Sequence, residues 1–372
     1  MLIGVPKEIK NHEYRVGFTP MSVREAVRQG HKVWVETNAG AGIGATDADY
    51  TQAGATIIPT AAEIFAKSDM IVKVKEPQAA ERKMLRPGQI LYTYLHLAPD
   101  PEQTKDLVAS GAICIAYETV TNAKGGLPLL APMSQVAGRM SVQSGAHCLE
   151  KAQGGRGVLL GGVPGVAPAK VVILGGGVVG TNAAAIALGM GADVTILEKS
   201  TDRMEELVAR FGTELKTIYS TQGAVEDECA GADLVIGGVL IPGAAAPKLV
   251  TKAMLKDWKP GSVLVDVAID QGGCAETSKA TTHANPTYVV DGVIHYCVAN
   301  MPGGVARTST FALNNVTLPF AMAIASKGWK KALADDPHLK NGLNVADGKV
   351  TYRAVAQDLG YDYVAADRAL AA

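Results

Sequence analysis

Residues 169–200, AKVVILGGGVVGTNAAAIALGMGADVTILEKS, decide the fold of this 372-residue chain. An apolar strand runs into a glycine cluster, and a helix of small residues and a second apolar strand follow. Gly175 permits a tight turn, Gly177 leaves room for a pyrophosphate, and Gly180 lets the helix pack closely on the sheet. Glu198 ends the second strand, where a carboxylate accepts hydrogen bonds from a ribose. The stretch therefore predicts a dinucleotide-binding unit.

The acidic residue at the end of the second strand also bears on the choice of dinucleotide. A carboxylate at Glu198 repels a 2′-phosphate, which favours NAD over NADP. Lys199 and Arg203 lie nearby in the sequence and weaken this preference for NAD.

The alternative to dinucleotide binding is a purely structural turn that binds no ligand, because glycine-rich turns are common.

The composition restricts the possible partners and the compartment. The net charge of −1 gives no basic field for nucleic acid, and 5% aromatic residues leave little material for stacking on bases. Residues 171–192 are uncharged over a length that could span a membrane, but glycines and a change from strand to helix pattern interrupt them. Five scattered cysteines without a CxxC pair indicate reduced thiols. We expect a soluble cytoplasmic protein without nucleic-acid or membrane partners.

Apolar strand-like runs alternate with helical stretches along the chain, which is typical of an α/β fold. We expect two α/β domains, with a Rossmann dinucleotide-binding domain inserted in a discontinuous substrate domain and long helices joining them. Long helices are expected over 133–153 and 305–329, the second interrupted by Pro319, and a glycine-rich hairpin over 154–168. The expected domain limits are 1–130 for the first part of the substrate domain, 131–306 for the NAD-binding domain and 307–372 for the return.

Ligands of open parallel sheets bind beyond the carboxyl ends of the strands. That rule selects three further loops in the second α/β unit, at 237–243, 266–273 and 298–303. Asp270 is the carboxylate of the middle loop and is expected where a nicotinamide would lie. The alternative for Asp270 is an aspartate that caps a helix or orders the loop.

Candidate substrate-binding residues follow strands in the first third of the chain. Lys75, His96 and Glu118 close three expected strands, and Arg15 lies in the loop after the first strand. A guanidinium fork can bind a carboxylate, an ammonium can bind a carbonyl oxygen, and a histidine exchanges protons near neutral pH. A solvated arginine, an edge lysine and a structural histidine are the alternatives. These residues indicate an NAD-dependent oxidoreductase that acts on a small carboxylate.

At these positions the chain resembles the family of alanine dehydrogenase, shared with the NAD-binding subunit of proton-translocating transhydrogenase. The stretches that carry the resemblance cover nearly the whole chain and are MLIGVPKEIKNHEYRVGFTP, VKVKEP, YLHLA, APMSQVAGRMSVQSGAHCLE, GGVPGVAPAKVVILGGGVVGTNAA, VLIPGAAAPKLV, VDVAIDQGGC and VANMPGGVARTST.

The resemblance implies reversible oxidative deamination of L-alanine by NAD to pyruvate, ammonia and NADH. It implies that Arg15 and Lys75 bind substrate, and that His96 and Asp270 are the catalytic pair. The cofactor-binding positions expected together from the motif, the strand-end loops and the resemblance are Ser134, Gly175, Gly177, Val178, Val179, Gly180, Glu198, Arg203, Ser220, Val239, Leu240, Val267, Ala268, Ile269, Asp270, Lys279, Val298, Ala299, Asn300 and Met301. Preference for alanine over serine, glycine or 2-aminobutyrate depends on the resemblance alone.

The resemblance also implies a homohexamer. Some members of the family bind magnesium through an acid such as Glu118, but the position that could supply a second ligand is Lys327 here, so we expect no metal. Three rival interpretations stay open: the transhydrogenase subunit, whose chains commonly continue into hydrophobic spans, a non-catalytic NAD sensor, and a saccharopine-type enzyme that differs in substrate.

Overall fold

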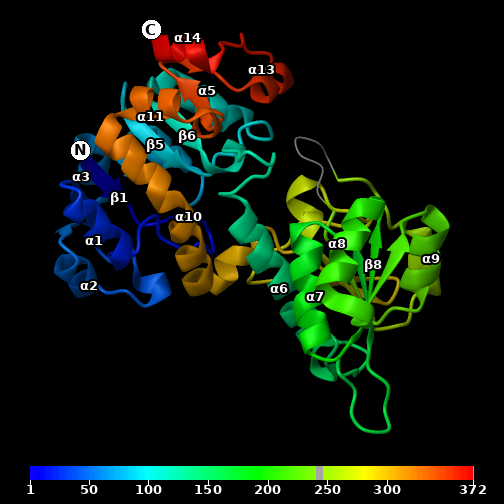
Figure 1. Cartoon of the computed structure of the whole chain (residues 1–372). Coiled ribbons are helices and arrows are strands. Elements are labelled where there is room, and N and C mark those ends of the chain that lie inside the picture. The colour runs from blue at the N-terminus through cyan, green and yellow to red at the C-terminus, as the bar shows by residue number, and fades with distance from the viewer. Residues whose placement is uncertain (240–245, 372) are drawn as a thin grey trace. The chain divides into compact units, whose positions relative to one another are not determined.

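The computed structural model describes residues 1–239 and 246–371, which form two compact units. The first unit combines residues 1–133 with 305–372, and the second unit comprises residues 134–304. Each unit contains a sheet flanked by helices, so the prediction of two α/β domains is confirmed (Figure 1). In the parts of the chain that the structure describes, no helix combines the length and apolar character needed to cross a membrane.

The first unit is built on an eight-stranded sheet with the order β15-β14-β6-β5-β4-β1-β2-β3. The six strands from the first part of the chain run parallel, and β14 and β15 add an antiparallel edge. The strands are β1 (Leu2–Val5), β2 (Lys32–Glu36), β3 (Thr56–Ile58), β4 (Met70–Val72), β5 (Ile90–Thr93), β6 (Ile113–Ala116), β14 (Leu343–Ala346) and β15 (Lys349–Val350). The sequence did not predict the two C-terminal strands, which are short and lie in a polar segment.

Helices cover both faces of this sheet. The α-helices of the unit are α1 (Pro20–Arg28), α2 (Asp47–Gln52), α3 (Ala61–Lys67), α4 (Ala79–Arg82), α5 (Pro101–Ser110), α10 (Ala306–Lys327), α11 (Trp329–Asp335), α12 (Pro337–Lys340), α13 (Arg353–Leu359) and α14 (Ala366–Ala371). Gly111 adopts a φ of 66° at the end of α5, as expected for a left-handed cap. The core on one face joins Phe65 of α3 and Leu107 of α5 to Ile71 and Leu91 of the sheet.

The prediction that Pro319 interrupts the long helix near the C-terminus is wrong, because α10 continues through it. Proline removes one backbone hydrogen bond from a helix and strains the preceding turn. Here the buried side of α10 is tied to the sheet, since the Tyr92 hydroxyl donates to the carbonyl oxygen of Thr317 at 3.2 Å. Asn314 lies on the same buried side and accepts from the backbone N–H of Thr19 at 2.9 Å. Tertiary contacts therefore outweigh the local preference.

The second unit contains a seven-stranded sheet with the order β12-β13-β11-β10-β7-β8-β9. Apart from the antiparallel edge strand β12, this is the strand order of a Rossmann fold, in which the chain reverses direction across the sheet beside its first strand. The strands are β7 (Lys170–Leu174), β8 (Asp193–Glu198), β9 (Leu215–Tyr219), β10 (Leu234–Gly237), β11 (Val263–Asp266), β12 (Thr287–Val290) and β13 (Val293–Tyr296).

Successive residues of the second sheet feed two separate cores, because neighbouring side chains of a strand point to opposite faces. Val171 and Ile173 pack with α6 and α7, whereas Val172 and Leu174 pack with α9. The α-helices of the unit are α6 (Ala131–Cys148), α7 (Val178–Gly189), α8 (Thr201–Phe211) and α9 (Gln222–Ala230), and Figure 1 shows α7 and α9 on opposite sides of β8. The expected long helix over 133–153 ends as an α-helix at Cys148, and in 154–168 only an isolated bridge between Val163 and Val166 forms.

Candidate functional site

Four neighbouring strands of the first sheet carry the candidate substrate-binding residues. The strands β6, β5, β4 and β1 are adjacent and parallel, so their carboxyl ends share one edge of the sheet. Arg15, Lys75 and His96 lie in the loops beyond β1, β4 and β5, and Glu118 lies in the short helix η2 (Tyr117–Thr119) beyond β6. The strands β4, β5 and β6 end two or three residues earlier than the sequence predicted, so Lys75 and His96 lie in loops and Glu118 lies in η2 instead of at the ends of strands.

Arg15 is buried, with 2% of its surface exposed, and its guanidinium is bound by Glu13. Its Nε donates to Oε1 of Glu13 at 2.7 Å, and its Nη2 donates to Oε2 at 2.6 Å. Nη1 lies 3.1 Å from the sulfur of Met133. Burial alone would lower the pKa of Arg15, but the bonds and the charge of Glu13 raise it above its ordinary value. The forked edge expected to bind a carboxylate ligand is therefore used by Glu13, which orients the guanidinium.

Lys75 is held by its backbone and by a neighbouring carboxylate. Its backbone N–H donates to Glu8 at 3.3 Å, and its carbonyl oxygen accepts from the hydroxyl of Thr93 at 3.0 Å. The Nζ atom lies 3.7 Å from Oε2 of Glu76, whose other oxygen pairs with Lys10. Burial raises the pKa of Glu76, but the charges of the two lysines outweigh burial and bring it below its ordinary value.

His96 adopts a left-handed backbone conformation with a φ of 51°, which few residues other than glycine tolerate. Glu118 holds this turn, since its carboxylate accepts the backbone N–H groups of Leu95 at 3.2 Å and His96 at 2.6 Å. The imidazole stacks on the ring of Tyr94 at 5.7 Å, with 41% of the side chain exposed. The ring is thus oriented by a neighbour while staying accessible to a ligand.

In the second unit, the glycine turn after β7 requires glycine for two different reasons. Gly175 has a φ of 95°, and a Cβ atom added at Gly180 would lie 1.9 Å from the carbonyl oxygen of Gly175, so the protein's own backbone excludes side chains at both positions. A Cβ atom added at Gly177 would meet nothing within 4 Å. Glycine at Gly177 therefore leaves open space at the start of α7, and this space fits the pyrophosphate of a dinucleotide at a helix N-terminus.

Glu198 and Arg203 converge on the same turn. Oε2 of Glu198 accepts the backbone N–H of Gly176 at 2.7 Å, while Oε1 accepts those of Lys199 at 2.7 Å and Ser200 at 3.0 Å. Burial raises the pKa of Glu198, but these bonds and the charge of Arg203 outweigh burial and lower it below its ordinary value. The Nε atom of Arg203 donates to the carbonyl oxygen of Gly176 at 2.8 Å. The carboxylate is kept ionised at the end of β8.

The loop after β11 is fastened at both ends by one carboxylate. Asp266 accepts the backbone N–H groups of Ala268 at 3.1 Å and Cys274 at 2.8 Å, and it also accepts from the hydroxyl of Ser278. Asp270 lies exposed in the short helix η6 (Val267–Gln271) between these anchors. Its neighbours Ala268 and Ile269 are buried, so the loop presents the acidic side chain outward.

The other expected cofactor positions come from several elements of the second unit, most of them at carboxyl ends of strands. Val239 follows β10 and lies against the glycine turn, because a Cβ atom added at Gly175 would meet its Cγ1 atom at 3.1 Å. Leu240 lies outside the described residues. The remaining positions are Ser134 on α6, Val178 and Val179 at the start of α7, Ser220 after β9, Val267 in η6, Lys279 in the following loop, and Val298, Ala299, Asn300 and Met301 after β13.

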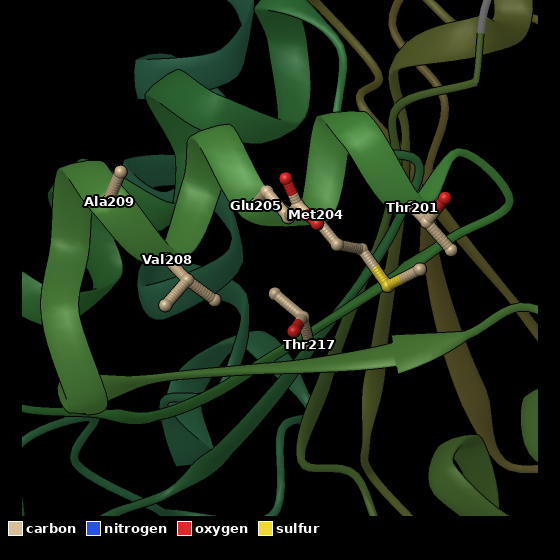
Figure 2. A pocket seen from close by; sticks show the side chains of 6 residues that line it. All are labelled: Thr201, Met204, Glu205, Val208, Ala209 and Thr217. Carbon is tan, nitrogen blue, oxygen red and sulfur yellow. The ribbon is translucent and has the colours of Figure 1, made fainter.

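The structure also bears on a metal site and contains a hollow in the second unit. Among the described residues, no group of three or more histidine, cysteine, aspartate or glutamate side chains could hold a metal ion. Lys327 pairs with Asp335 at 2.8 Å. A shallow hollow lies between α8 and β9 and is shown in Figure 2. It is lined by Thr201, Met204, Glu205, Val208, Ala209 and Thr217, none of which the sequence predicted to contact the cofactor.

The acidic partners Glu8 and Glu13 and the buried Lys73 lie at this site without having been predicted from the sequence. Lys73 lies in MIVKVK, at a position where the apolar pattern of a buried strand is broken by a charge. That break is a signal for a buried counterion, because lysine is almost never fully buried unpaired. The partner could not be read from the sequence, since Glu8 precedes Lys73 by 65 residues.

Comparisons with known proteins agree over the full length of the chain. The family models for the N-terminal and C-terminal domains of Alanine dehydrogenase/PNT match residues 4–137 and 141–353. An alanine dehydrogenase of Halomonas elongata is 64% identical over 98% of this chain and 99% of its own length, and one of Bacillus subtilis is 56% identical over 100% and 98%.

Solved structures agree with this result. A structure of L-alanine dehydrogenase has a TM-score of 0.94 and 53% identity, and the match covers 97% of this chain and 99% of that chain. A transhydrogenase from Sinorhizobium meliloti has a TM-score of 0.83 and 27% identity, with 94% and 100% covered. The chain belongs to the Alanine dehydrogenase/PNT family.

Proposed function

We propose that this chain is an NAD-dependent L-alanine dehydrogenase that converts L-alanine, water and NAD to pyruvate, ammonia and NADH, and catalyses the reverse reaction. The observation that carries this proposal is the similarity to relatives named alanine dehydrogenase. One of them is 64% identical and another is 51% identical, each over 98% of this chain. The transhydrogenase alternative has less support, since the transhydrogenase structure shares 27% identity. The non-catalytic sensor gives no reason for two cations and a histidine at neighbouring strand ends.

We propose that the first unit binds the amino acid. Arg15, whose Nε and Nη2 are held by Glu13, contributes its positive charge to the binding of the substrate carboxylate, and Lys75 binds the carbonyl oxygen of pyruvate. The residues proposed to exchange protons with the substrate are His96 of this unit and Asp270 of the second unit. They act as water adds to the iminium carbon and ammonia leaves. The left-handed turn at His96 supports its role, because strained backbone conformations concentrate at functional sites.

We propose that the second unit binds NAD. The open space at Gly177 fits the pyrophosphate, and the ionised Glu198 fits the adenosine ribose. When bound, NAD supplies the nicotinamide carbon that accepts the hydrogen of the alanine Cα atom as hydride. Arg203 keeps the turn in shape through its bond to the carbonyl oxygen of Gly176.

We also propose that the protein acts in the cytoplasm as a homohexamer. All five cysteines are buried free thiols, which suits a reducing compartment. Apolar side chains exposed in the second unit, Leu159 at 65% and Val166 at 62%, are of the kind that contacts between copies cover. Light scattering of the purified protein measures the oligomer, and a monomeric mass would contradict this part of the proposal.

An absorbance assay of NADH formation with a panel of L-amino acids tests the reaction. We expect activity with L-alanine and much less with glycine, L-serine and L-2-aminobutyrate. The reverse assay, with pyruvate, ammonia and NADH, should consume NADH only when ammonia is present. Absence of activity with every amino acid, together with normal NADH binding, would contradict the proposal and favour the sensor or the transhydrogenase subunit.

A further inference from the structure

A buried triad of charges lies beneath Lys75 in the first unit. The Nζ atom of Lys73 donates to Oε2 of Glu8 at 2.9 Å and to Oε1 of Glu81 at 2.7 Å. The side chain of Lys73 is fully buried, and those of Glu8 and Glu81 are each 2% exposed. Three ionisable groups at this depth incur a large desolvation cost, so stability alone does not account for the triad.

The backbone around Lys75 shows what Glu8 provides. Its second oxygen, Oε1, accepts the N–H groups of Val74 at 2.7 Å and Lys75 at 3.3 Å. Glu8 therefore accepts two of the three N–H groups between Lys73 and Lys75, and the third donates to the carbonyl oxygen of Tyr92 at 3.2 Å. Without the Glu8 carboxylate, the backbone N–H groups of Val74 and Lys75 would lose their acceptor.

The carbonyl oxygens of the same three residues are also bound. Those of Lys73, Val74 and Lys75 accept from the Tyr117 hydroxyl at 2.9 Å, the Tyr94 N–H at 3.2 Å and the Thr93 hydroxyl at 3.0 Å, respectively. The segment is thus fixed on both sides, and Glu8 is the only side chain among the described residues that binds its N–H groups. Lys73 in turn holds the Glu8 carboxylate.

We infer that Glu8 is a positioning residue that fixes the backbone of Lys75, so that its ammonium meets the oxygen of the keto acid. This inference rests on the proposed function, which assigns Lys75 to the substrate. Glu81 neutralises Lys73 and accepts the N–H of Gln78 at 2.7 Å, but it makes no bond to Val74 or Lys75. Glu81 is therefore a matched control: it has the same burial and the same lysine, without the link to the substrate cation.

The test compares Glu8→Gln with Glu81→Gln in the full-length enzyme. Both variants remove one charge from the same triad, so both should lower the melting temperature. We expect Glu8→Gln to lower kcat/KM for pyruvate roughly 10- to 100-fold, because small misplacements of a substrate-binding group have effects of this size. We expect Glu81→Gln to change it less than about threefold. The Kd of NADH should stay within about twofold of wild type in both.

A double-mutant cycle with Lys75→Gln separates positioning from general damage. The Kd of pyruvate for the NAD-loaded protein, measured by calorimetry, should be raised by either single variant, and adding Glu8→Gln to Lys75→Gln should raise it less than about twofold further. Equal losses of kcat/KM in Glu8→Gln and Glu81→Gln would overturn the inference. Full additivity of Glu8→Gln and Lys75→Gln in the Kd of pyruvate would also overturn it. If Lys75→Gln alone leaves pyruvate binding unchanged, the assignment of Lys75 in the proposed function fails, and the inference fails with it.

Discussion

The two units position their candidate site residues in different ways. In the first unit, buried carboxylates hold the site residues: Glu13 binds the side chain of Arg15, and Glu8, which pairs with Lys73, binds the backbone of Lys75. In the second unit, the backbone does most of the work, through the glycine turn and the N–H groups that Glu198 accepts. A site built from buried charges is therefore sensitive to removal of a side chain, whereas a site built from backbone is sensitive to addition of one.

The largest expected effect comes from His96→Ala in the first unit. If His96 transfers protons, turnover should fall about 10²- to 10⁴-fold, while the Kd of NADH stays near the wild-type value. Steady-state rates and a fluorescence titration with NADH measure the two quantities. A loss of NADH binding would mean that His96 supports the structure, and it would weaken the contrast between the two units.

The next effect tests the buried pair of Arg15 and Glu13. Arg15→Met alone leaves a buried carboxylate without its counterion, which should lower the free energy of unfolding by about 3–5 kcal/mol. Adding Glu13→Leu should restore much of the stability, because apolar residues often replace a buried pair at little cost. Urea denaturation measures the stability. The KM for pyruvate should be higher than that of the wild type in both the single and the double variant. Recovery of substrate affinity in the double variant would exclude Arg15 as a substrate ligand.

A smaller effect concerns the glycine turn of the second unit. Gly177→Ala should weaken NADH binding about tenfold, equivalent to about 1.4 kcal/mol, without lowering the melting temperature, since the added Cβ atom meets no protein atom within 4 Å. Gly189→Ala is the matched control, because its Cβ atom also meets nothing and it lies at the far end of α7. If the two variants bind NADH equally well, the space at Gly177 is not a ligand site.

The smallest effect is a pH dependence from Glu198. Its pKa is lower in the folded protein than the ordinary value of 4.5, so its stabilising contribution is present above pH 4.5 and is lost as the pH falls through the folded pKa. Glu198→Gln should therefore be less stable than wild type at pH 7, and the difference should shrink as the pH falls below about 4.5. Urea denaturation at several pH values checks this. A difference that does not vary with pH would contradict ionisation as the cause.

The contrast between the units also explains how far the sequence could predict them. The glycine turn follows from local sterics, because the backbone excludes side chains at Gly175 and Gly180, and both positions lie between two apolar strands. The two α/β domains follow from the alternation of apolar runs and helical stretches. The continuous helix at Pro319 depends on distant contacts, so the local sequence predicted it wrongly. The short strands β14 and β15 also depend on distant contacts, and the local sequence did not predict them.

The amino-acid sequence by itself determined where strands and helices alternate, where the dinucleotide turn lies, and which cations and histidine follow strands. Only the tertiary structure decided the partners of those groups: Glu13 for Arg15, Glu8 for Lys73 and the backbone of Lys75, and Glu118 for the turn at His96. The physical reason is range. Backbone sterics act between neighbours in the chain, whereas a buried charge is stabilised by whichever counterion the fold brings within hydrogen-bonding distance, even from 65 residues away.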